Sequence, residues 1–400
     1  MRSLIILKLD HKCKYMKNIL ILGGGFAGVE AAIYLRKKGF EVTIISNRDF
    51  LYIYPTSIWI PVGISSFENN CISLESLKKV HGFNLIIDEV EVIKTKERKI
   101  YCKNKTYEFE YLVIAMGSGK VSHEGISNTL TICGEPKESI KLKDKIDKLI
   151  AKGNGKISIG FGANPKDASN VRGGPAFELL FNLHNKLQKL GIRDNFELTF
   201  FAPMSEPGAR MGKNALKLMD KLYKKLDIKQ QIGKKILRFE ESGILFEDNI
   251  FIESDLTMFI AAGDGHNVFK NSNLSLNDAG LININDFCEV LGEEKVYAIG
   301  DSVSLKGPNW RAKQGHLAEV MAKNVAFNID AKSDSDKKSY TKHLNILCVM
   351  DSGNGAMFVY RSEKRALLIP LPIIGHWLKK GWGWYYKNSK LNKIPRIPGM

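Results

Sequence analysis

Short apolar runs alternate with amphipathic segments along most of the chain. The first series of apolar runs predicts buried strands at residues 19–22, 41–45, 111–115 and 296–299, with helices at 29–38 and 315–329. A second series predicts strands at 156–161, 197–202 and 256–262, with helices at 136–152 and 175–190. Strands that alternate with helices favour parallel sheets. The predicted fold class is therefore α/β, with two Rossmann-like dinucleotide-binding domains.

The order of the two series predicts how the domains are arranged. The last strand of the first series follows the whole second series, so the second domain is expected to be inserted in the first. Residues 1–15 precede Met16 and the first strand, and we expect them to be a disordered extension. The other predicted units are the first domain at 16–135 and 269–330, the inserted domain at 136–268, and a C-terminal domain at 331–400.

Composition narrows the range of partners. The chain has 59 Lys and Arg against 43 Asp and Glu, a net charge of +16, which favours an acidic partner. Lysines are spread along the whole chain, so a lysine-rich codon bias is the preferred explanation for most of the excess. No recognition motif accompanies the charge, so nucleic acid is not an expected partner. The sequence leaves the oligomeric state open and allows a homo-oligomer.

The cysteines and the hydropathy exclude other classes of protein. The six cysteines are widely spaced and form no CxxC pair, so we expect neither a disulfide scaffold nor a metal site. No apolar run reaches the roughly 18 residues of a membrane-spanning helix.

A glycine-rich turn joins the first predicted strand to the first predicted helix. In Gly23-x-Gly25-x-x-Gly28, the first glycine permits the tight turn and the second lets the backbone approach a pyrophosphate. The third lets the helix pack closely on the strand, so that the helix N-terminus faces the phosphates. Gly23, Gly25, Phe26, Ala27 and Gly28 are therefore predicted to bind a dinucleotide.

Two more segments lie at the ends of predicted strands, at 111–117 (YLVIAMG) and 296–301 (VYAIGD). With the glycine turn, they resemble the FAD motifs of the two-dinucleotide-domain flavoproteins, the disulfide-reductase-like superfamily. The resemblance implies that FAD is the cofactor and that Ala115 and Gly117 lie beside it.

The same resemblance implies roles at the end of the last strand. Gly300 closes the strand, and Asp301 hydrogen-bonds the ribitol hydroxyls of FAD. The helix that starts near Gly315 points its dipole at the flavin pyrimidine, which stabilises negative charge on the reduced ring. Lys313 and Gln314 precede that helix and are expected to contact the cofactor.

The sequence departs from the superfamily pattern at two dinucleotide-contacting positions. Ser46 and Asn47 stand where an acid usually binds the adenosine ribose, so a neutral hydrogen bond is expected there. In the inserted domain, Gly160 and Gly162 have no third glycine three residues on, and no helix follows at once. The NADH site of that domain is therefore predicted to be degraded.

A flavin domain pair with a degraded NADH site and a C-terminal extension resembles the sulfide:quinone oxidoreductase and flavocytochrome c sulfide dehydrogenase family. The specific stretches are 42–63 (VTIISNRDFLYIYPTSIWIPVG), 173–178 (GGPAFE), 313–315 (KQG) and 345–351 (NILCVMD). The resemblance implies sulfide and a quinone as substrates. It places Cys348 by the flavin and matches Cys133 to the family's earlier cysteine.

One departure affects the expected reaction. In the family, sulfide oxidation runs through a cysteine pair, but the stretch at 169–172, where the second redox cysteine is expected, contains none. Cys348 could form such a pair only if Cys133 or another cysteine approached it. Two other functions stay open: a quinone reductase like type II NADH dehydrogenase, and a flavin-binding homologue that has lost sulfide turnover.

Two charged residues complete the predicted catalytic set. Glu178 is expected in the first turn of its helix, where the helix dipole alone would explain it. The resemblance adds a proton-relay role for Glu178 near the quinone. Lys313 is expected either to pair with reduced flavin or a quinone oxygen, or to be solvated.

The C-terminal segment predicts contact with a membrane surface. Residues 373–396 contain three tryptophans, two tyrosines, five lysines and one arginine, and no acid. Aromatic and basic side chains suit the headgroup region, and anionic lipid attracts the charge. We expect a peripheral, monotopic membrane protein, and the alternative is a helix that packs on the protein's own core.

Overall fold

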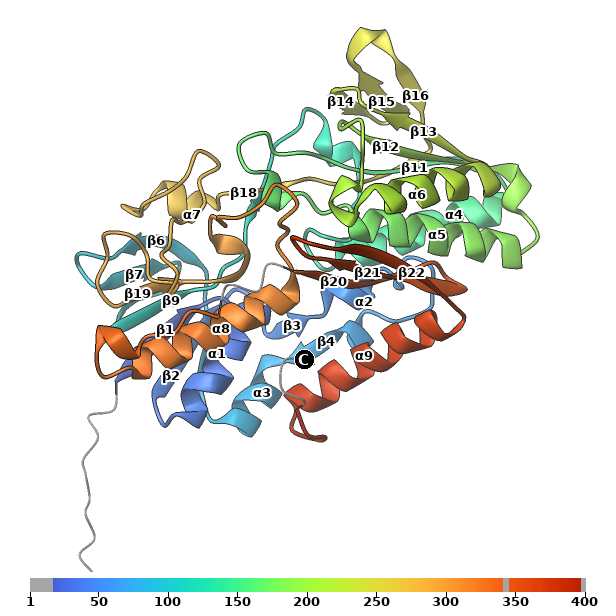
Figure 1. Ribbon diagram of the computed structural model, residues 1–400. Coiled ribbons are helices and arrows are strands. Elements are labelled where there is room, and N and C mark those ends of the chain that lie inside the picture. Colours follow the sequence, from blue (N-terminus) through green and yellow to red (C-terminus); the bar gives the residue numbers. More distant parts are fainter. Residues whose placement is uncertain (1–16, 341–344, 397–400) are drawn as a thin grey trace, which may run out of the picture.

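The computed structural model describes residues 17–340 and 345–396, so the extension predicted at 1–15 lies outside the described residues. A parallel sheet forms the centre of the first domain (Figure 1). Its strand order is β19 (Val296–Ala298), β9 (Tyr111–Ile114), β1 (Asn18–Leu22), β2 (Glu41–Ser46) and β5 (Asn84–Ile87). The central strands are buried apolar runs, as expected of parallel strands that are covered on both faces.

Two long helices pack against each other beside this sheet. They are α1 (Phe26–Lys37) and α8 (Gly315–Asp330), and Figure 1 shows them side by side. Smaller elements complete the domain: β3 (Phe50–Tyr52), α2 (Tyr54–Ser57), β4 (Cys71–Ser73), α3 (Leu74–His81), β6 (Val90–Lys94), β7 (Lys99–Cys102), β8 (Thr106–Glu108) and α7 (Asn267–Lys270).

A second parallel sheet is inserted between β9 and β19 of the first. Its order is β13 (Ile228–Ile232), β12 (Phe196–Ala202), β11 (Gly155–Phe161) and β17 (Leu256–Ile260). The helices α4 (Glu138–Lys152), α5 (Gly174–Lys189) and α6 (Lys213–Lys225) pack on it. An antiparallel sheet of β14 (Ile236–Glu240), β15 (Gly243–Phe246) and β16 (Phe251–Glu253) extends from its far end, and β10 (Gly119–Lys120) pairs with β18 (Gly263–Asp264). The two-sheet α/β fold predicted from the sequence is confirmed.

The C-terminal part forms a third layer. The antiparallel strands β20 (Ile346–Asp351), β21 (Gly355–Arg361) and β22 (Ala366–Pro372) lie between α5 and the final helix, α9 (Ile374–Lys390) (Figure 1). None of the described helices is both long enough and apolar enough to cross a membrane.

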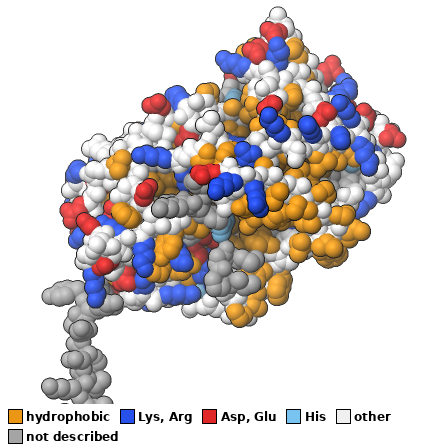
Figure 2. Space-filling model, viewed as in Figure 1, with side chains coloured by type: hydrophobic (Ala, Val, Ile, Leu, Met, Phe, Trp, Pro, Cys, Tyr) orange, Lys and Arg blue, Asp and Glu red, His pale blue; other side chains and the backbone are white. Residues whose placement is uncertain are grey.

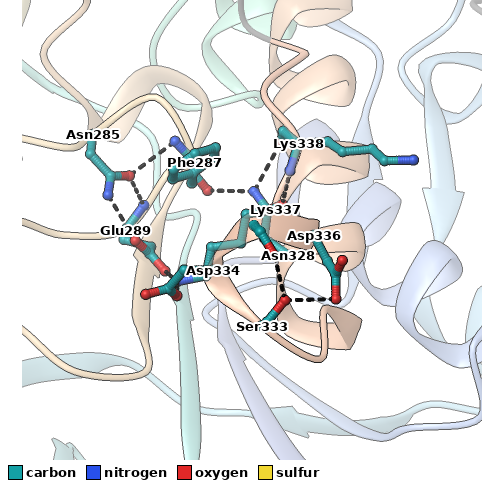
Figure 3. A network of polar contacts seen from close by, with 10 residues as sticks. Asn285, Phe287, Glu289, Asn328, Ser333, Asp334, Asp336, Lys337 and Lys338 are labelled. Atoms are coloured by element: carbon teal, nitrogen blue, oxygen red, sulfur yellow. Dashed lines mark hydrogen bonds and ion pairs between the residues drawn. The ribbon is translucent and has the colours of Figure 1, made fainter.

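A polar network fixes the segment that follows α8 (Figure 3). The Lys337 ammonium lies 2.7 Å from a carboxylate oxygen of both Glu289 and Asp334. The Asn328 amide donates to the Phe287 carbonyl oxygen at 3.1 Å and accepts from the Lys338 backbone N–H at 2.8 Å. The end of α8 is thereby held to the loop that precedes β19.

A buried ion cluster joins α9 to the two long helices. Lys390 pairs with Glu30 on α1 and lies 2.6 Å from Glu319 on α8, and Arg396 also pairs with Glu30. Tyr386 stacks on Phe26 with the ring centroids 5.0 Å apart. The inner face of α9 therefore packs on the first domain.

This arrangement corrects part of the membrane prediction. Lys379, Lys390 and Arg396 were expected to attract anionic lipid, but all three form ion pairs with carboxylates of the protein itself. Buried ammonium groups need such partners because desolvation of an unpaired charge is costly. The inner face of α9 is thus not available to a membrane, and its outer face is.

Candidate active site

The glycine turn has the geometry that a dinucleotide pyrophosphate needs. A Cβ on Gly23, whose φ is +109°, would lie 2.4 Å from the Ala115 oxygen, and one on Gly28 would lie 1.9 Å from the Gly23 oxygen. A Cβ on Gly25 would meet nothing within 4 Å. The first two close contacts shape the turn, whereas the space over Gly25 opens toward the N-terminus of α1, which begins at Phe26.

The ends of β9 and β19 are joined across the sheet. The Gly117 backbone N–H donates to the Ser302 hydroxyl at 3.0 Å, and this hydroxyl donates to the Gly117 oxygen at 3.1 Å. Gly300, with φ +69°, lies so close to Ala27 that an added Cβ would be 3.0 Å from the Ala27 methyl carbon. All three predicted FAD motifs therefore meet at one edge of the first sheet.

At the predicted position of the adenosine ribose, the side chains are less clearly placed to bind the cofactor. The buried Ser46 hydroxyl donates to the Arg48 backbone oxygen at 2.7 Å, so this hydroxyl is already engaged locally. Asn47 is exposed next to it. Contact of either residue with the adenosine ribose stays a prediction.

Asp301 has a partner that sequence reasoning missed. Its carboxylate forms an ion pair with Arg172, and its backbone oxygen accepts a hydrogen bond from the Lys313 ammonium at 2.9 Å. Arg172 lies in the stretch where the family's second redox cysteine was sought. A ribitol hydroxyl would have to share Asp301 with this guanidinium. The absence of a cysteine was visible in the sequence, but the pairing of Arg172 with Asp301 was not.

Lys313 is not a solvated surface lysine. Burial lowers its pKa to about 7, and the nearby Arg172 charge acts in the same direction while Asp167 opposes both. Folding thus lowers the pKa of the Lys313 ammonium from 10.5 to about 7. Between these two pH values, Lys313 binds fewer protons in the native state than in the unfolded chain. Lys313 by itself therefore makes the free energy of unfolding rise with pH across this window.

Replacement of Lys313 by methionine is expected to remove that rise. Denaturant unfolding of the FAD-free protein at several pH values between 7 and 10 measures it. Lys306→Met, a replacement at an exposed lysine seven residues earlier, is the matched control and should keep the wild-type slope. A slope that is the same in all three proteins would contradict the prediction.

The start of α8 lies against the C-terminal sheet. Gln314 precedes the helix, and its side-chain amide lies 3.5 Å from the Leu347 oxygen on β20. A Cβ on Gly315 would be 3.2 Å from the Phe26 ring at the start of α1. The positive ends of both helices therefore face the same region, which also contains Cys348, the neighbour of Leu347.

Cys133 and Cys348 both lie near the Glu178 carboxyl. Burial raises the pKa of the Cys348 thiol to about 11, and the Glu178 charge adds to this rise. Burial also raises the pKa of Cys133, where Arg172 and Lys120 oppose the rise and Glu178 reinforces it. Neither cysteine is in a disulfide among the described residues. The structure thus brings three of the four predicted catalytic residues together, with Lys313 on the neighbouring loop.

The position of Glu178 differs from the prediction. Helix α5 begins at Gly174, so Glu178 is its fifth residue and lies beyond the first turn. Its side chain is buried, forms an ion pair with Lys379 of α9, and accepts the backbone N–H of Asp351 at 2.7 Å. Tertiary partners, rather than the helix dipole, account for a carboxylate at this position.

The second glycine segment has a packing role. A Cβ on Gly160 would lie 2.3 Å from the Phe201 oxygen, and one on Gly162 would lie 2.9 Å from the Phe259 ring. Helix α5 starts only at Gly174, after a loop from the end of β11 at Phe161. These glycines permit close contact between neighbouring strands, which explains them without a bound phosphate.

The residues at the sheet edge fit FAD. The open space over Gly25 and the start of α1 suit the pyrophosphate, while Asp301 and the start of α8 are placed for the ribitol and the flavin ring. FAD bound in this way would supply a two-electron acceptor beside Cys348.

Comparison with known proteins agrees with this geometry. The chain is 26% identical over 367 residues to the sulfide-quinone reductase of Aquifex aeolicus, covering 86% of this chain and 83% of the relative. It is 20% identical over 372 residues to a type II NADH:quinone oxidoreductase of Staphylococcus epidermidis, covering 86% and 90%.

Among solved structures, the sulfide:quinone oxidoreductase of Aquifex aeolicus superposes with a TM-score of 0.83 at 23% identity, covering 94% of this chain and 92% of that one. Residues 17–322 match the family model described as pyridine nucleotide-disulphide oxidoreductase. The chain is thus an oxidoreductase and belongs to the pyridine nucleotide-disulphide oxidoreductase family.

Proposed function

We propose that the protein is a FAD-dependent sulfide:quinone oxidoreductase that works at a membrane surface. The observation that carries the proposal is the meeting of Cys348, Glu178 and the start of α8 at one place, from which Lys379 leads to α9. A thiol and the expected flavin position therefore lie next to each other, and the Glu178–Lys379 pair connects them to the C-terminal layer. The similarity to a sulfide-quinone reductase over most of both chains supports it.

The surroundings of Cys133, where sulfide is expected to enter, contain two positively charged side chains. Arg172 and Lys120 both lower the pKa of Cys133 against the effect of burial, so their charges lie close to this thiol. Hydrosulfide is an anion and would be attracted to these two cations. The two cations next to Cys133 therefore suit sulfide as the electron donor.

The reaction needs only one cysteine to balance. When a thiol and hydrosulfide form a persulfide anion, one sulfur–sulfur bond forms, two S–H bonds break, and two protons are released. The two electrons released need an acceptor, which bound FAD would supply. Cys348 is the proposed thiol because Leu347, the residue before it, contacts Gln314 at the start of α8, where the flavin is expected. The Glu178–Lys379 pair would accept and pass on a released proton, because it adjoins Cys348 and is shielded from water.

The test is a flavin spectrum. The purified protein should show flavin absorbance that bleaches with sulfide and recovers when an oxidised short-chain quinone is added. Rapid bleaching by NADH would favour the type II NADH dehydrogenase function instead. If neither donor bleaches a stably bound flavin, the protein is a flavin-binding homologue without this turnover.

We also infer that the outer face of α9 and the adjoining β22 contact the membrane. Figure 2 shows a broad apolar surface in this part of the molecule. Its exposed apolar side chains come from β20, β22, α9 and Ile373, the residue between β22 and α9: Leu347, Leu367, Ile369, Ile373, Ile374, Trp377, Leu378 and Trp384. An apolar surface of this kind marks an interaction site, and its tryptophans suit the headgroup region. A lipid-soluble quinone would approach from this side.

Removal of two tryptophans should weaken membrane binding. Trp377 and Trp384 are 65% and 63% exposed, and insertion of a large apolar side chain contributes about 1.5–3 kcal/mol. The variant Trp377→Ala/Trp384→Ala is therefore expected to bind phospholipid vesicles roughly a hundredfold less tightly. Vesicle sedimentation measures this, with Leu237→Ala as the control, since Leu237 is exposed on the distant β14 (Figure 1). Equal binding of both variants would argue against this surface.

A further inference from the structure

A histidine on α9 is held by a fully buried carboxylate. Asp351, at the end of β20, has no exposed surface, and its Oδ2 lies 2.6 Å from the Nδ1 atom of His376. The other oxygen, Oδ1, accepts from the Asn182 amide and from the Gly353 backbone N–H, both at 2.8 Å. These donors fix the carboxylate, and among its three partners in the described part of the chain only the imidazole can change protonation state.

The carboxylate determines which imidazole nitrogen can exchange a proton. Because Asp351 accepts from Nδ1–H, the Nε2 atom is left for other chemistry. The hydrogen bond to Asp351 orients the His376 ring, so that Nε2 is the atom that can carry a proton. The arrangement uses the chemistry of other carboxylate–histidine pairs, in which the acid orients the ring and does not itself take the proton.

Beside this ring lies a buried donor that lacks an acceptor. The Trp59 ring lies 5.6 Å from the His376 ring, centroid to centroid, and Trp59 is 4% exposed. Its indole Nε1–H has no hydrogen-bond partner among the described residues. An unsatisfied buried donor costs about 1–3 kcal/mol, which a bound carbonyl oxygen would recover.

His376 lies between the outer surface of α9 and the buried carboxylates of the protein interior. Its neighbours Trp377 and Leu378 are exposed on the proposed membrane face, and its side chain is 13% exposed. On the inner side, Asp351 donates its backbone N–H to Glu178, the partner of Lys379. The charged groups around the imidazole are thus Asp351 from β20, Glu178 from α5, and Lys379 and Lys380 from α9 itself.

We propose that His376, oriented by Asp351, donates a proton to a carbonyl oxygen of the bound quinone, and that the Trp59 indole binds the same oxygen. This assignment rests on the proposed function. Reduction of a quinone to the quinol takes two electrons and two protons. Bound FAD, once reduced, would supply the two electrons and one proton, and the second proton would come from Nε2 of the imidazolium. Neutral His376 then regains its proton from water at the membrane surface.

The experiment separates the two halves of the reaction by stopped flow. Sulfide-driven bleaching should be the same in His376→Gln as in the wild type, while reoxidation at saturating quinone should be about a hundredfold slower. Added imidazole should restore reoxidation in His376→Ala. His81→Gln is the matched control, because His81 also contacts α9, through the Lys390 oxygen at 2.7 Å, but lies at the other end of the helix. It should reoxidise at the wild-type rate.

Trp59→Phe provides a second, independent readout. It should raise the quinone KM several-fold with little change in kcat, and it should weaken the quenching of tryptophan fluorescence by oxidised quinone in the absence of sulfide. Wild-type reoxidation by folded, flavin-loaded His376→Gln would overturn the role of His376, and an unchanged KM in Trp59→Phe would overturn that of Trp59. If quinone fails to reoxidise the wild-type flavin, the proposed function itself has failed, which these variants alone would not show.

Discussion

Replacement of Cys348 by serine should abolish bleaching of the flavin by sulfide while leaving the flavin bound. The thiol is the proposed site of sulfur–sulfur bond formation, and a hydroxyl cannot form that bond. Loss of a nucleophile lowers the rate by far more than loss of a positioning contact, so a decrease on the order of a hundredfold or more is expected. Stopped-flow absorbance after mixing with sulfide measures the rate.

Two controls show whether this loss is specific. Cys71→Ser changes another partly buried cysteine, on β4, and should bleach at the wild-type rate. Cys133→Ser tests whether a cysteine pair is needed: a normal rate would favour a persulfide on Cys348 alone, and a loss equal to that of Cys348→Ser would favour the pair. If Cys348→Ser bleaches as fast as Cys71→Ser, the proposed role of Cys348 is wrong.

Substitutions in the glycine turn should separate folding from cofactor binding. In Gly28→Ala, the new methyl group would lie 1.9 Å from the Gly23 oxygen, so α1 must move away from β1. Overpacking of this kind costs about 1–3 kcal/mol, and we expect both a lower Tm of the FAD-free protein and loss of bound flavin. In Gly25→Ala the methyl group meets no protein atom within 4 Å, but it would occupy the space of the pyrophosphate.

Gly25→Ala should therefore keep the Tm of the FAD-free protein and lose most of its bound flavin. Thermal unfolding and the flavin content of the purified protein measure the two effects. Gly381→Ala is the control, because its methyl group also meets nothing within 4 Å but lies in α9. A Gly25→Ala protein that binds flavin as tightly as Gly381→Ala would contradict the position assigned to the pyrophosphate.

The local motifs could be predicted because their chemistry depends on near neighbours. Gly23 and Gly28 contact each other within a single turn, and β1 and α1 flank that turn in sequence. Both parallel sheets could also be predicted from local sequence. A strand that is buried on both faces must be a continuous apolar run, which is visible in the sequence. No element was predicted at α3, α6, β14 or β15. Helix α6 does bury Ala215, Met219 and Tyr223 at helical spacing, so its pattern was available, whereas β14 and β15 are short strands.

The polar partners in the site could not be predicted, because they are far apart along the chain. Glu178 and Lys379 are separated by 201 residues, and residue type alone does not distinguish Lys379 from Lys380 beside it, which lies over the Trp377 ring. One signal was available: Lys379, Tyr386 and Lys390 recur at helical spacing, which predicts a shared face. Arg172 carries no such signal, because its partner Asp301 lies in a distant part of the sequence.

The ion cluster between α9 and the long helices has a consequence for biosynthesis. Glu30 and its partner Lys390 are 360 residues apart, so the helix that carries the glycine turn is made long before its counter-charge exists. Until α9 arrives, Glu30, Glu319 and the Phe26 ring are exposed on one surface of the nascent first domain. Contacts of such sequence separation form slowly, and exposed apolar surface in the meantime favours aggregation. Chains that stop before residue 374 should therefore depend on chaperones, and flavin insertion should be a late event in maturation.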